Sequence, residues 1–117
     1  MPDDLHCAAK VTADVVSGRW KVQILQCLFK GTQRFSALQH AIEGITQKVL
    51  TQQLRELEAD HVIHRQVFPE VPPRVEYSLT EFGTSLWPVL NTMHEWGLRQ
   101  LAERSDSPAA PGPAGEV

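Results

Sequence analysis

The spacing of apolar residues changes once along the chain, after Asp60, and this change constrains the fold more than any other feature. Before it, apolar residues such as Trp20, Ile24 and Leu28 recur every three or four positions, as on one face of a helix. After it, residues from Ile63 onward alternate at a period of two, which indicates β-strands. A run of helices followed by a short ribbon predicts an α+β fold that is mainly helical.

Two helices are expected near the start of the chain. They cover residues 7–16 and 19–30 and are separated by Ser17 and Gly18. The second carries its apolar side chains at helical spacing, and Gly31 is placed to end it.

Two shorter helical segments follow with very few residues between them. We expect Ser36 to cap a helix over residues 37–43, which Gly44 closes. Thr46 is then placed to open the next helix, from Gln47 to about Asp60. Two helices joined by so tight a turn are typical of a helix-turn-helix.

The two expected strands cover residues 63–68 and 75–79. Between them, residues 69–73 read Pro-Glu-Val-Pro-Pro, and proline cannot continue the hydrogen bonding of either strand. A ribbon directly after a helix-turn-helix forms a wing. The predicted fold class is therefore a winged helix-turn-helix with a two- to three-stranded antiparallel wing.

Thr80 is placed to cap a last helix that runs from Glu81 to about Arg104. Pro88 lies inside this segment and should bend the helix or break its first turns. The length suits one domain, which we assign to residues 1–104. Residues 105–117 are rich in Pro, Ala and Gly, a composition typical of a disordered tail.

The helix from Gln47 to about Asp60 has a polar face that suits a DNA groove. Its three leucines fall within one narrow sector, which should face the core. Lysine and arginine on the opposite side can bind guanine or phosphate, glutamine can bind adenine, and threonine offers a methyl group to thymine. Unpaired N–H groups at the start of the helix favour a phosphate oxygen. The predicted contacts on this helix are Thr46, Gln47, Lys48, Thr51, Gln52 and Arg55. The alternative is an ordinary solvated helix face, and residue types alone weigh the two equally.

Further contacts are expected around this helix. Arg34 and Ser36, at the start of the short helix, and Arg74, at the end of the wing, complete the predicted DNA-binding set. Arg74 has an equal alternative as a surface charge opposite Glu76 or Glu70. Arg19 and Lys21 are further candidates for phosphate contacts.

The formal net charge of −3 argues against nucleic-acid binding, but the charge is unevenly distributed along the chain. Residues 18–80 carry eight Lys and Arg against six Asp and Glu, so the acidic excess lies at the two ends. Local patches bind phosphate, and net charge adds only a long-range bias that salt screens. The sequence also predicts no signal peptide and no membrane span, and hence a cytoplasmic protein with reduced thiols.

Several separated motifs match a known family in order and spacing. They are G-[RK]-W, R-F-x-x-L, G-I-[ST]-x-K-x-L, L-x-x-L-E-x-D, P-P-R-V-E-Y-x-L-T-x-x-G and the closing HEWG. Over about residues 7–97 the chain resembles the HxlR-type winged helix-turn-helix transcriptional regulators, which are related to the MarR group. The resemblance implies a homodimer built mainly by the first and last helices, which binds a palindromic operator in double-stranded DNA. The two recognition helices would then enter successive major grooves, with centres about 34–36 Å apart.

The last helix supports a dimer independently of the resemblance. Apolar residues form a stripe on it that is broader than one small domain can cover. The predicted interface residues are Leu86, Trp87, Leu90, Met93 and Trp96.

Cys7 is a candidate sensor of oxidants or electrophiles, because some members of this family sense them through a cysteine before the first helix. A cysteine at a helix N-terminus gains thiolate character from the helix dipole, whereas Asp3 and Asp4 would oppose it. Relatives commonly have Cys-Pro where this chain has Cys-Ala-Ala, and a packing role at the dimer interface is an equal alternative. Cys27 is expected to be a packing residue.

The sequence argues against several functions other than DNA binding. The chain lacks a glycine-rich phosphate loop, a paired-carboxylate cleft and a nucleophile elbow, so we expect no enzyme. Its five histidines are not grouped at ligand spacings, so no metal and no cofactor are expected. The remaining alternatives are a regulator switched by a small molecule at the dimer interface and a winged helix used for protein contact.

Overall fold

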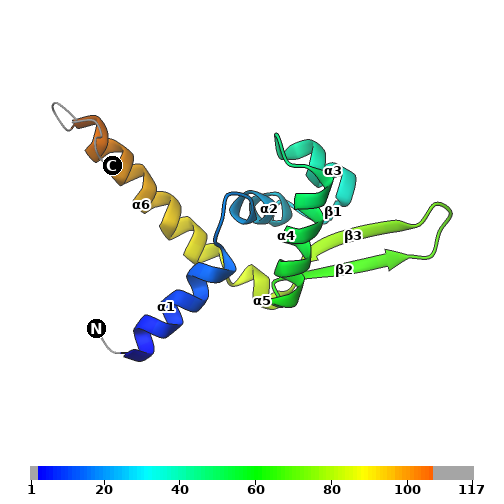
Figure 1. Cartoon of the computed structure of the whole chain (residues 1–117), viewed down its shortest axis with the longest axis horizontal. Coiled ribbons are helices and arrows are strands. Elements are labelled where there is room, and N and C mark those ends of the chain that lie inside the picture. The colour runs from blue at the N-terminus through cyan, green and yellow to red at the C-terminus, as the bar shows by residue number, and fades with distance from the viewer. Residues whose placement is uncertain (1–2, 107–117) are drawn as a thin grey trace. The chain divides into compact units, whose positions relative to one another are not determined.

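The structure is a computed structural model that describes residues 3–106. The chain divides into two compact units, one ending at Ser85 and the other beginning at Leu86. The first unit contains, in order, α1 (Asp3–Val15), α2 (Lys21–Phe29), β1 (Gln33–Arg34), α3 (Phe35–Ala41), α4 (Gln47–Ala59), β2 (Ile63–Phe68), β3 (Arg74–Leu79) and α5 (Glu81–Thr84) (Figure 1). The second contains α6 (Trp87–Asp106).

The first unit is a winged helix-turn-helix, so the predicted α+β fold class is confirmed. In Figure 1, α2, α3 and α4 form a cluster, and the β2–β3 hairpin extends away from it as the wing. Aliphatic side chains of these three helices, the turn between α3 and α4, and the start of β2 are withdrawn from solvent. The core of this unit includes Ile24, Leu25, Leu28, Leu38, Ile42, Ile45, Leu50, Leu54, Leu57, Val62 and Ile63.

The sheet is three-stranded and antiparallel, in the order β1-β3-β2. β2 and β3 pair along their full length, from Ile63 opposite Leu79 to Phe68 opposite Arg74. β1 consists of two residues, with Gln33 opposite Tyr77. The sequence did not predict β1, because two residues are too few to show a period.

α4 has well-defined ends, and both follow from its sequence. The hydroxyl of Thr46 accepts a hydrogen bond from the backbone N–H of Val49 at 3.2 Å, as predicted for the N-cap. At the other end His61 has φ 64°, and the N–H of Val62 bonds to the carbonyl of Leu57 at 3.0 Å. This is a Schellman-type ending, which turns the chain sharply from α4 into β2.

The first two helices start elsewhere than expected. α1 begins at Asp3, four residues before the predicted start, because the apolar pattern used to place it begins only at Cys7. α2 covers Lys21–Phe29 rather than residues 19–30, and Trp20 is its N-cap.

The prediction that Ser36 caps the short helix is wrong. The N-cap is Arg34, in an extended conformation and without a side-chain cap, and Ser36 is the second residue of α3. The physical reason is the pairing of β1 with β3, which holds Gln33 and Arg34 extended so that the helix begins directly afterwards.

The predicted last helix is broken, as Pro88 implied. α5 ends at Thr84, and Pro88 is the second residue of α6. Proline is tolerated in the first turn of a helix but has no N–H to continue a helix that arrives from before it. α6 continues to Asp106, so the first two residues of the predicted tail are helical, and residues 107–117 lie outside the described residues.

A close backbone contact joins α5 to the end of α4. Thr80 is the N-cap of α5, as predicted, and its hydroxyl accepts from the N–H of Gly83 at 2.8 Å. The same hydroxyl donates to the carbonyl of His61 at 2.7 Å. A Cβ atom at Gly83 would lie 2.0 Å from the carbonyl oxygen of Val62, so only glycine fits at this corner.

Two helices carry apolar side chains that their own unit leaves exposed. In the first unit Val11 of α1 is 63% exposed. In the second unit α6 exposes Trp87, Met93, Trp96, Leu98 and Leu101, with fractions of 46–58%. Within residues 3–106 no helix combines the length and hydropathy that crossing a bilayer requires.

Candidate nucleic-acid interface

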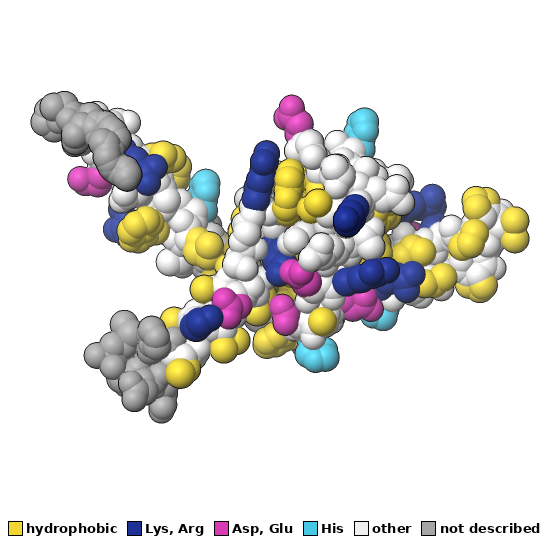
Figure 2. Space-filling model, viewed as in Figure 1, with side chains coloured by type: hydrophobic (Ala, Val, Ile, Leu, Met, Phe, Trp, Pro, Cys, Tyr) yellow, Lys and Arg dark blue, Asp and Glu magenta, His cyan; other side chains and the backbone are white. Residues whose placement is uncertain are grey.

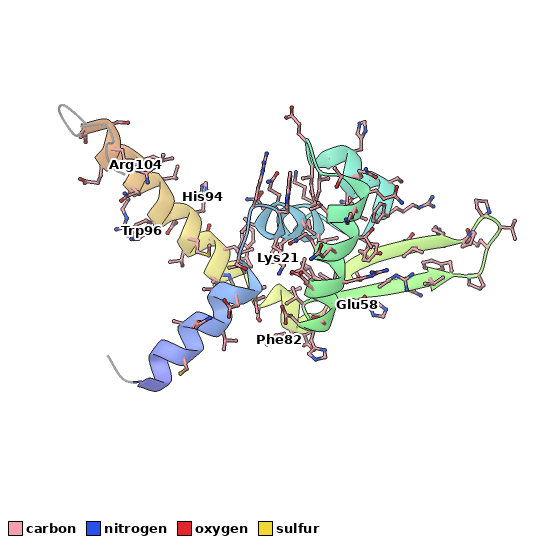
Figure 3. All side chains as sticks on the ribbon, in the orientation of Figure 1. Lys21, Glu58, Phe82, His94, Trp96 and Arg104 are labelled. Atoms are coloured by element: carbon pink, nitrogen blue, oxygen red, sulfur yellow. The ribbon has the colours of Figure 1, made fainter. Side chains whose placement is uncertain are left out.

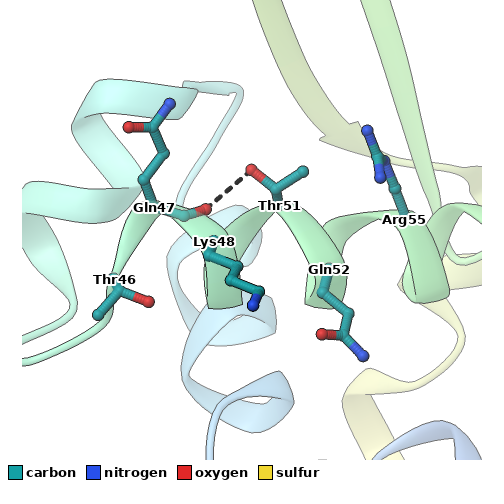
Figure 4. A pocket seen from close by; sticks show the side chains of 6 residues that line it. All are labelled: Thr46, Gln47, Lys48, Thr51, Gln52 and Arg55. Carbon is teal, nitrogen blue, oxygen red and sulfur yellow. Dashed lines mark hydrogen bonds between the residues drawn. The ribbon is translucent and has the colours of Figure 1, made fainter.

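The outer face of α4 is the most extensive predicted site that the structure assembles. Leu50, Leu54 and Leu57 are buried, as predicted, so the opposite side of the helix faces solvent. An open hollow of about 690 Å³ lies along that side. It is lined by the six predicted contacts of this helix: Thr46, Gln47, Lys48, Thr51, Gln52 and Arg55 (Figure 4).

The first turn of α4 offers backbone donors. Of the first three N–H groups of the helix, that of Val49 donates to Thr46. The N–H groups of Gln47 and Lys48 have no acceptor among the described residues, because the first turn of a helix lacks intrahelical partners. Together with the positive end of the helix dipole they suit a phosphate oxygen.

Two side chains on this face are oriented by neighbours on the same helix. The hydroxyl of Thr51 donates to the carbonyl of Gln47 at 2.8 Å, the dashed line in Figure 4. With its hydrogen engaged, the hydroxyl can still accept a hydrogen bond, and the methyl group remains for apolar contact. The amide nitrogen of Gln52 donates to the carboxylate of Glu56 at 3.4 Å.

Lys21 is not available for phosphate, and its prediction as a backbone contact is wrong. Its side chain is 7% exposed, and its ammonium lies 2.6 Å from a carboxylate oxygen of Glu56. Figure 3 places Lys21 between α2 and α4. The hydrogen bond from Lys21 is the main cause that lowers the pKa of Glu56, with smaller contributions from the charge of Lys21 and from Gln52, while partial burial opposes them.

A second hollow, of about 460 Å³, brings the start of α3 next to the wing loop. Its lining includes the remaining predicted contacts, Arg34, Ser36 and Arg74. Ser36 and Arg34 are exposed there. The nine predicted DNA-binding residues therefore line two surface hollows of the first unit, although they are spread over 41 positions from Arg34 to Arg74.

Arg74 pairs with Glu70 and Glu76, which is the alternative to a DNA contact that the sequence left open. Its guanidinium lies 3.0 Å from the carboxylate of Glu70 and 3.6 Å from that of Glu76, and it stacks on the ring of Phe68 at 4.0 Å. The Nε atom is buried and has no hydrogen-bond partner among the described residues. A DNA contact by Arg74 stays a prediction, and it would compete with both carboxylates.

Arg65 lines a hollow beside α4, although the sequence analysis did not predict it as a site residue. It is exposed on β2 and, with Thr51, Arg55 and Tyr77, lines a third hollow of about 320 Å³ between α4 and the wing. The available signal was its place in the alternating pattern, where it shares a strand face with Ile63, a core residue. Arg65 therefore lies on the face of β2 that includes Ile63, and β2 packs on α4.

Acidic residues concentrate toward the C-terminal half of α4. Glu56 and Glu58 lie there and Asp60 is the C-cap, whereas from Gln47 to Arg55 the charged side chains are Lys48 and Arg55. In Figure 2, Lys and Arg side chains lie over α4 and the base of the wing, with acidic groups beside them, whereas the tip of the wing is hydrophobic. Because these carboxylates repel phosphate, the part of α4 before them is the side on which contacts with DNA stay a prediction.

The two cysteines occupy different environments. Cys7 is exposed, and Cys27 is partly buried on α2, in agreement with a packing role for the latter. Cys7 is the fifth residue of α1, so it does not lie at the helix N-terminus, and the argument from the helix dipole fails. No group of three or more His, Cys, Asp or Glu within residues 3–106 is arranged to hold a metal ion.

The predicted interface residues on α6 differ in exposure. Trp87, Met93 and Trp96 are exposed, whereas Leu86 is partly buried. Leu90 is 8% exposed in the single chain, so it adds little to a surface for a partner.

Comparison with known proteins agrees with this geometry. Residues 15–105 match the family model described as HxlR-like helix-turn-helix. The chain is 47% identical over 96 residues to the uncharacterized HTH-type transcriptional regulator YybR of Bacillus subtilis, covering 82% of this chain and 77% of that protein. It is 50% identical to YdeP of the same organism, covering 81% and 75%.

Solved structures give the same result. The redox regulator HypR in its reduced form superposes with a TM-score of 0.75 and is 44% identical, covering 85% of this chain and 94% of that one. Diamide-treated YodB from B. subtilis has a TM-score of 0.69 and 37% identity, covering 77% and 89%.

Proposed function

Since the chain belongs to the HxlR-like helix-turn-helix family of DNA-binding transcriptional regulators, we propose that it binds a palindromic operator as a homodimer through the outer face of α4. The family consists of regulators and not of enzymes, in agreement with the sequence analysis. One observation carries the proposal: six side chains with the chemistry of base and phosphate recognition line a single open hollow on α4.

The contacts divide by chemistry. Gln52 and Arg55, on the outer face of α4, are the proposed base-reading residues. Thr46 and the free N–H groups of Gln47 and Lys48 are proposed to hold a phosphate, and this fixes the register of the helix in the groove. Arg34 and Ser36, which line the second hollow, are proposed as further contacts with the DNA backbone.

The dimer is proposed from the exposed apolar surface of α6. Trp87, Met93 and Trp96 leave about half of their area in solvent, which is costly for a lone helix in water. A second copy would cover it, and Val11 is an exposed apolar side chain on α1. Both helices are those that the family resemblance implicates in dimerisation.

We propose Cys7 as the site at which a signal reaches the protein, by oxidation or by electrophile modification. Its support is its exposure on α1, together with the family neighbours HypR, solved in reduced and oxidized forms, and YodB, solved after diamide treatment. A small molecule at the dimer interface is the alternative signal.

Footprinting of the purified protein on its own upstream region tests the proposal. We expect two protected half-sites with centres about one helical turn apart, and a dimer by sedimentation equilibrium. Affinity for that duplex should fall steeply with salt, because phosphate contacts release counterions. A protein that protects no sequence and binds duplexes without salt dependence would instead be a protein-interaction module.

A further inference from the structure

We propose that Glu56 is a positioning residue for base recognition. Held by the buried ammonium of Lys21, its carboxylate orients the amide of Gln52 so that Oε1 of Gln52 faces the duplex. The inference rests on the proposed function, because it concerns how the outer face of α4 discriminates between bases.

The two oxygens of the Glu56 carboxylate have different partners. Oε1 lies 2.6 Å from Nζ of Lys21, whose side chain belongs to the buried interior of the first unit. Oε2 accepts the hydrogen bond from Nε2 of Gln52 at 3.4 Å, on the solvent side of α4. Glu56 is 43% exposed, so one carboxylate bridges the interior and the outer face of the helix. A core residue of α2 is thereby connected to a side chain that lines the candidate DNA site.

The charge of Glu56 decides which end of the amide faces it. An ionised carboxylate only accepts hydrogen bonds, so it selects the nitrogen of Gln52 and repels the oxygen. The pKa of Glu56 is lowered, mainly by its hydrogen bond from Lys21, so the group is ionised at neutral pH. Since Lys21 is held in the interior, it fixes one side of the carboxylate and limits the rotamers that Glu56 can adopt.

This orientation has a consequence for specificity. A free glutamine can turn its amide either way and can pair with both N6 and N7 of adenine. With one N–H of Nε2 bound to Glu56, the amide of Gln52 is held in one orientation, so Oε1 keeps a fixed place beside the remaining N–H. At the place of Oε1 the amide accepts a hydrogen bond from the exocyclic amine of adenine or cytosine, whereas O4 of thymine or O6 of guanine would be repelled there. Gln52 should therefore prefer a base that carries an amine at the contacted position of each half-site.

The test is selection of binding sequences from a pool of randomised duplex DNA by the full chain. Wild type, Gln52→Ala, Glu56→Gln and Glu58→Gln are compared. The position at which Gln52→Ala loses its preference is the one that Gln52 contacts. There, wild type should favour adenine and cytosine over thymine and guanine by about tenfold, the effect of one hydrogen bond gained or lost.

In Glu56→Gln this preference should fall to about twofold or less, with the other positions unchanged.

Glu58→Gln is the matched control. It removes the same charge from the same helix, and Glu58 makes no side-chain hydrogen bond or ion pair within residues 3–106. Its selected sequences should equal those of wild type. Because Glu56→Gln leaves Lys21 beside a neutral group, the double variant Lys21→Met/Glu56→Gln is included, and circular dichroism verifies that each variant is folded. The double variant should show the same selective loss.

Two outcomes would overturn the role of Glu56. Either the Gln52-dependent preference survives in both Glu56 variants, or all positions weaken equally, as a purely structural role predicts. The failure of the proposed function looks different, because wild type itself would then select no sequence from the pool.

Discussion

The ammonium of Lys21 and the carboxylate of Glu56 lie 2.6 Å apart, yet only the lysine is buried. The pair joins α2 to α4, the scaffold helix to the helix that carries the candidate DNA site. The two partners of this ion pair are not equivalent. Without Lys21, the carboxylate of Glu56 can still be hydrated, whereas without Glu56 the buried ammonium of Lys21 cannot reach water.

Removal of the acid should therefore destabilise the protein more than removal of the base. Glu56→Ala leaves a buried ammonium without its acceptor and should lower the free energy of unfolding by about 3 kcal/mol. Lys21→Met keeps the aliphatic volume and frees a carboxylate that is already half exposed, so it should cost less than about 1 kcal/mol. Urea unfolding of both variants measures the difference. Equal losses would mean that Lys21 is hydrated in solution.

The same pair predicts a specific dependence of stability on pH. The pKa of Glu56 is lowered from its ordinary value of 4.5 in the folded chain, so folding favours the ionised group. Its contribution is complete above that ordinary value and is lost as the pH falls through the lowered pKa. The stability advantage of wild type over Glu56→Gln should thus shrink as the pH falls below the ordinary pKa of 4.5. Urea unfolding of both proteins at a series of pH values above and below 4.5 checks it.

Two glycines should respond oppositely to alanine. At Gly83 a Cβ atom would lie 2.0 Å from the carbonyl oxygen of Val62, so Gly83→Ala must displace backbone and should cost about 3 kcal/mol. At Gly97, inside α6, a Cβ meets nothing within 4 Å. There, alanine should be neutral or should stabilise by up to about 1 kcal/mol through its helix propensity. Thermal unfolding distinguishes the two, and similar melting temperatures would contradict the close contact at Gly83.

Truncation of the outer face of α4 should weaken operator binding. Arg55→Ala and Gln52→Ala should each cost about 1–3 kcal/mol in binding free energy and relax base preference at one position. Lys10→Ala is the control, since it removes a cation that pairs with Asp14 on α1. Fluorescence anisotropy at constant salt on the footprinted operator measures all three. Wild-type affinity in both α4 variants would show that another surface contacts the DNA.

Cys7 should control release from DNA without affecting DNA binding itself. Cys7→Ser should bind the operator as wild type does but should no longer be released by diamide or quinones. Cys27→Ser, at the partly buried cysteine, should still be released. Anisotropy before and after each reagent, and again after a thiol reductant, records the change. Release that persists in Cys7→Ser would direct the search to a small molecule at the dimer interface.

The recognition helix was predictable because its determinants are local. The cap at Thr46, the leucines of one sector and the polar residues opposite them are set by helical geometry within about 14 residues. The break near Pro88 was predictable for the same reason, since proline acts on its own turn of helix. The helix-turn-helix, the wing and most of the candidate contacts follow from such local rules.

The errors have a common cause, which is contact between distant segments. Ser36 is not a cap because β1 pairs with β3, about 40 residues later in the chain. In the sequence nothing distinguishes Lys21 from an exposed cation, because its partner Glu56 lies on another helix. Likewise nothing distinguishes Arg65 from other polar residues of a strand, because the hollow that it lines is formed with α4.

The amino-acid sequence by itself determined the presence of the helix-turn-helix and the wing, the fold class and the outward face of α4, because each depends on neighbours within a few turns. Only the tertiary structure decided that Lys21 is buried against Glu56, that Arg74 is held by Glu70 and Glu76, and that Arg65 and Arg55 line one hollow. The state of a charged side chain depends on which other segments exclude water from it, and that is fixed only when the helices and the wing have packed together.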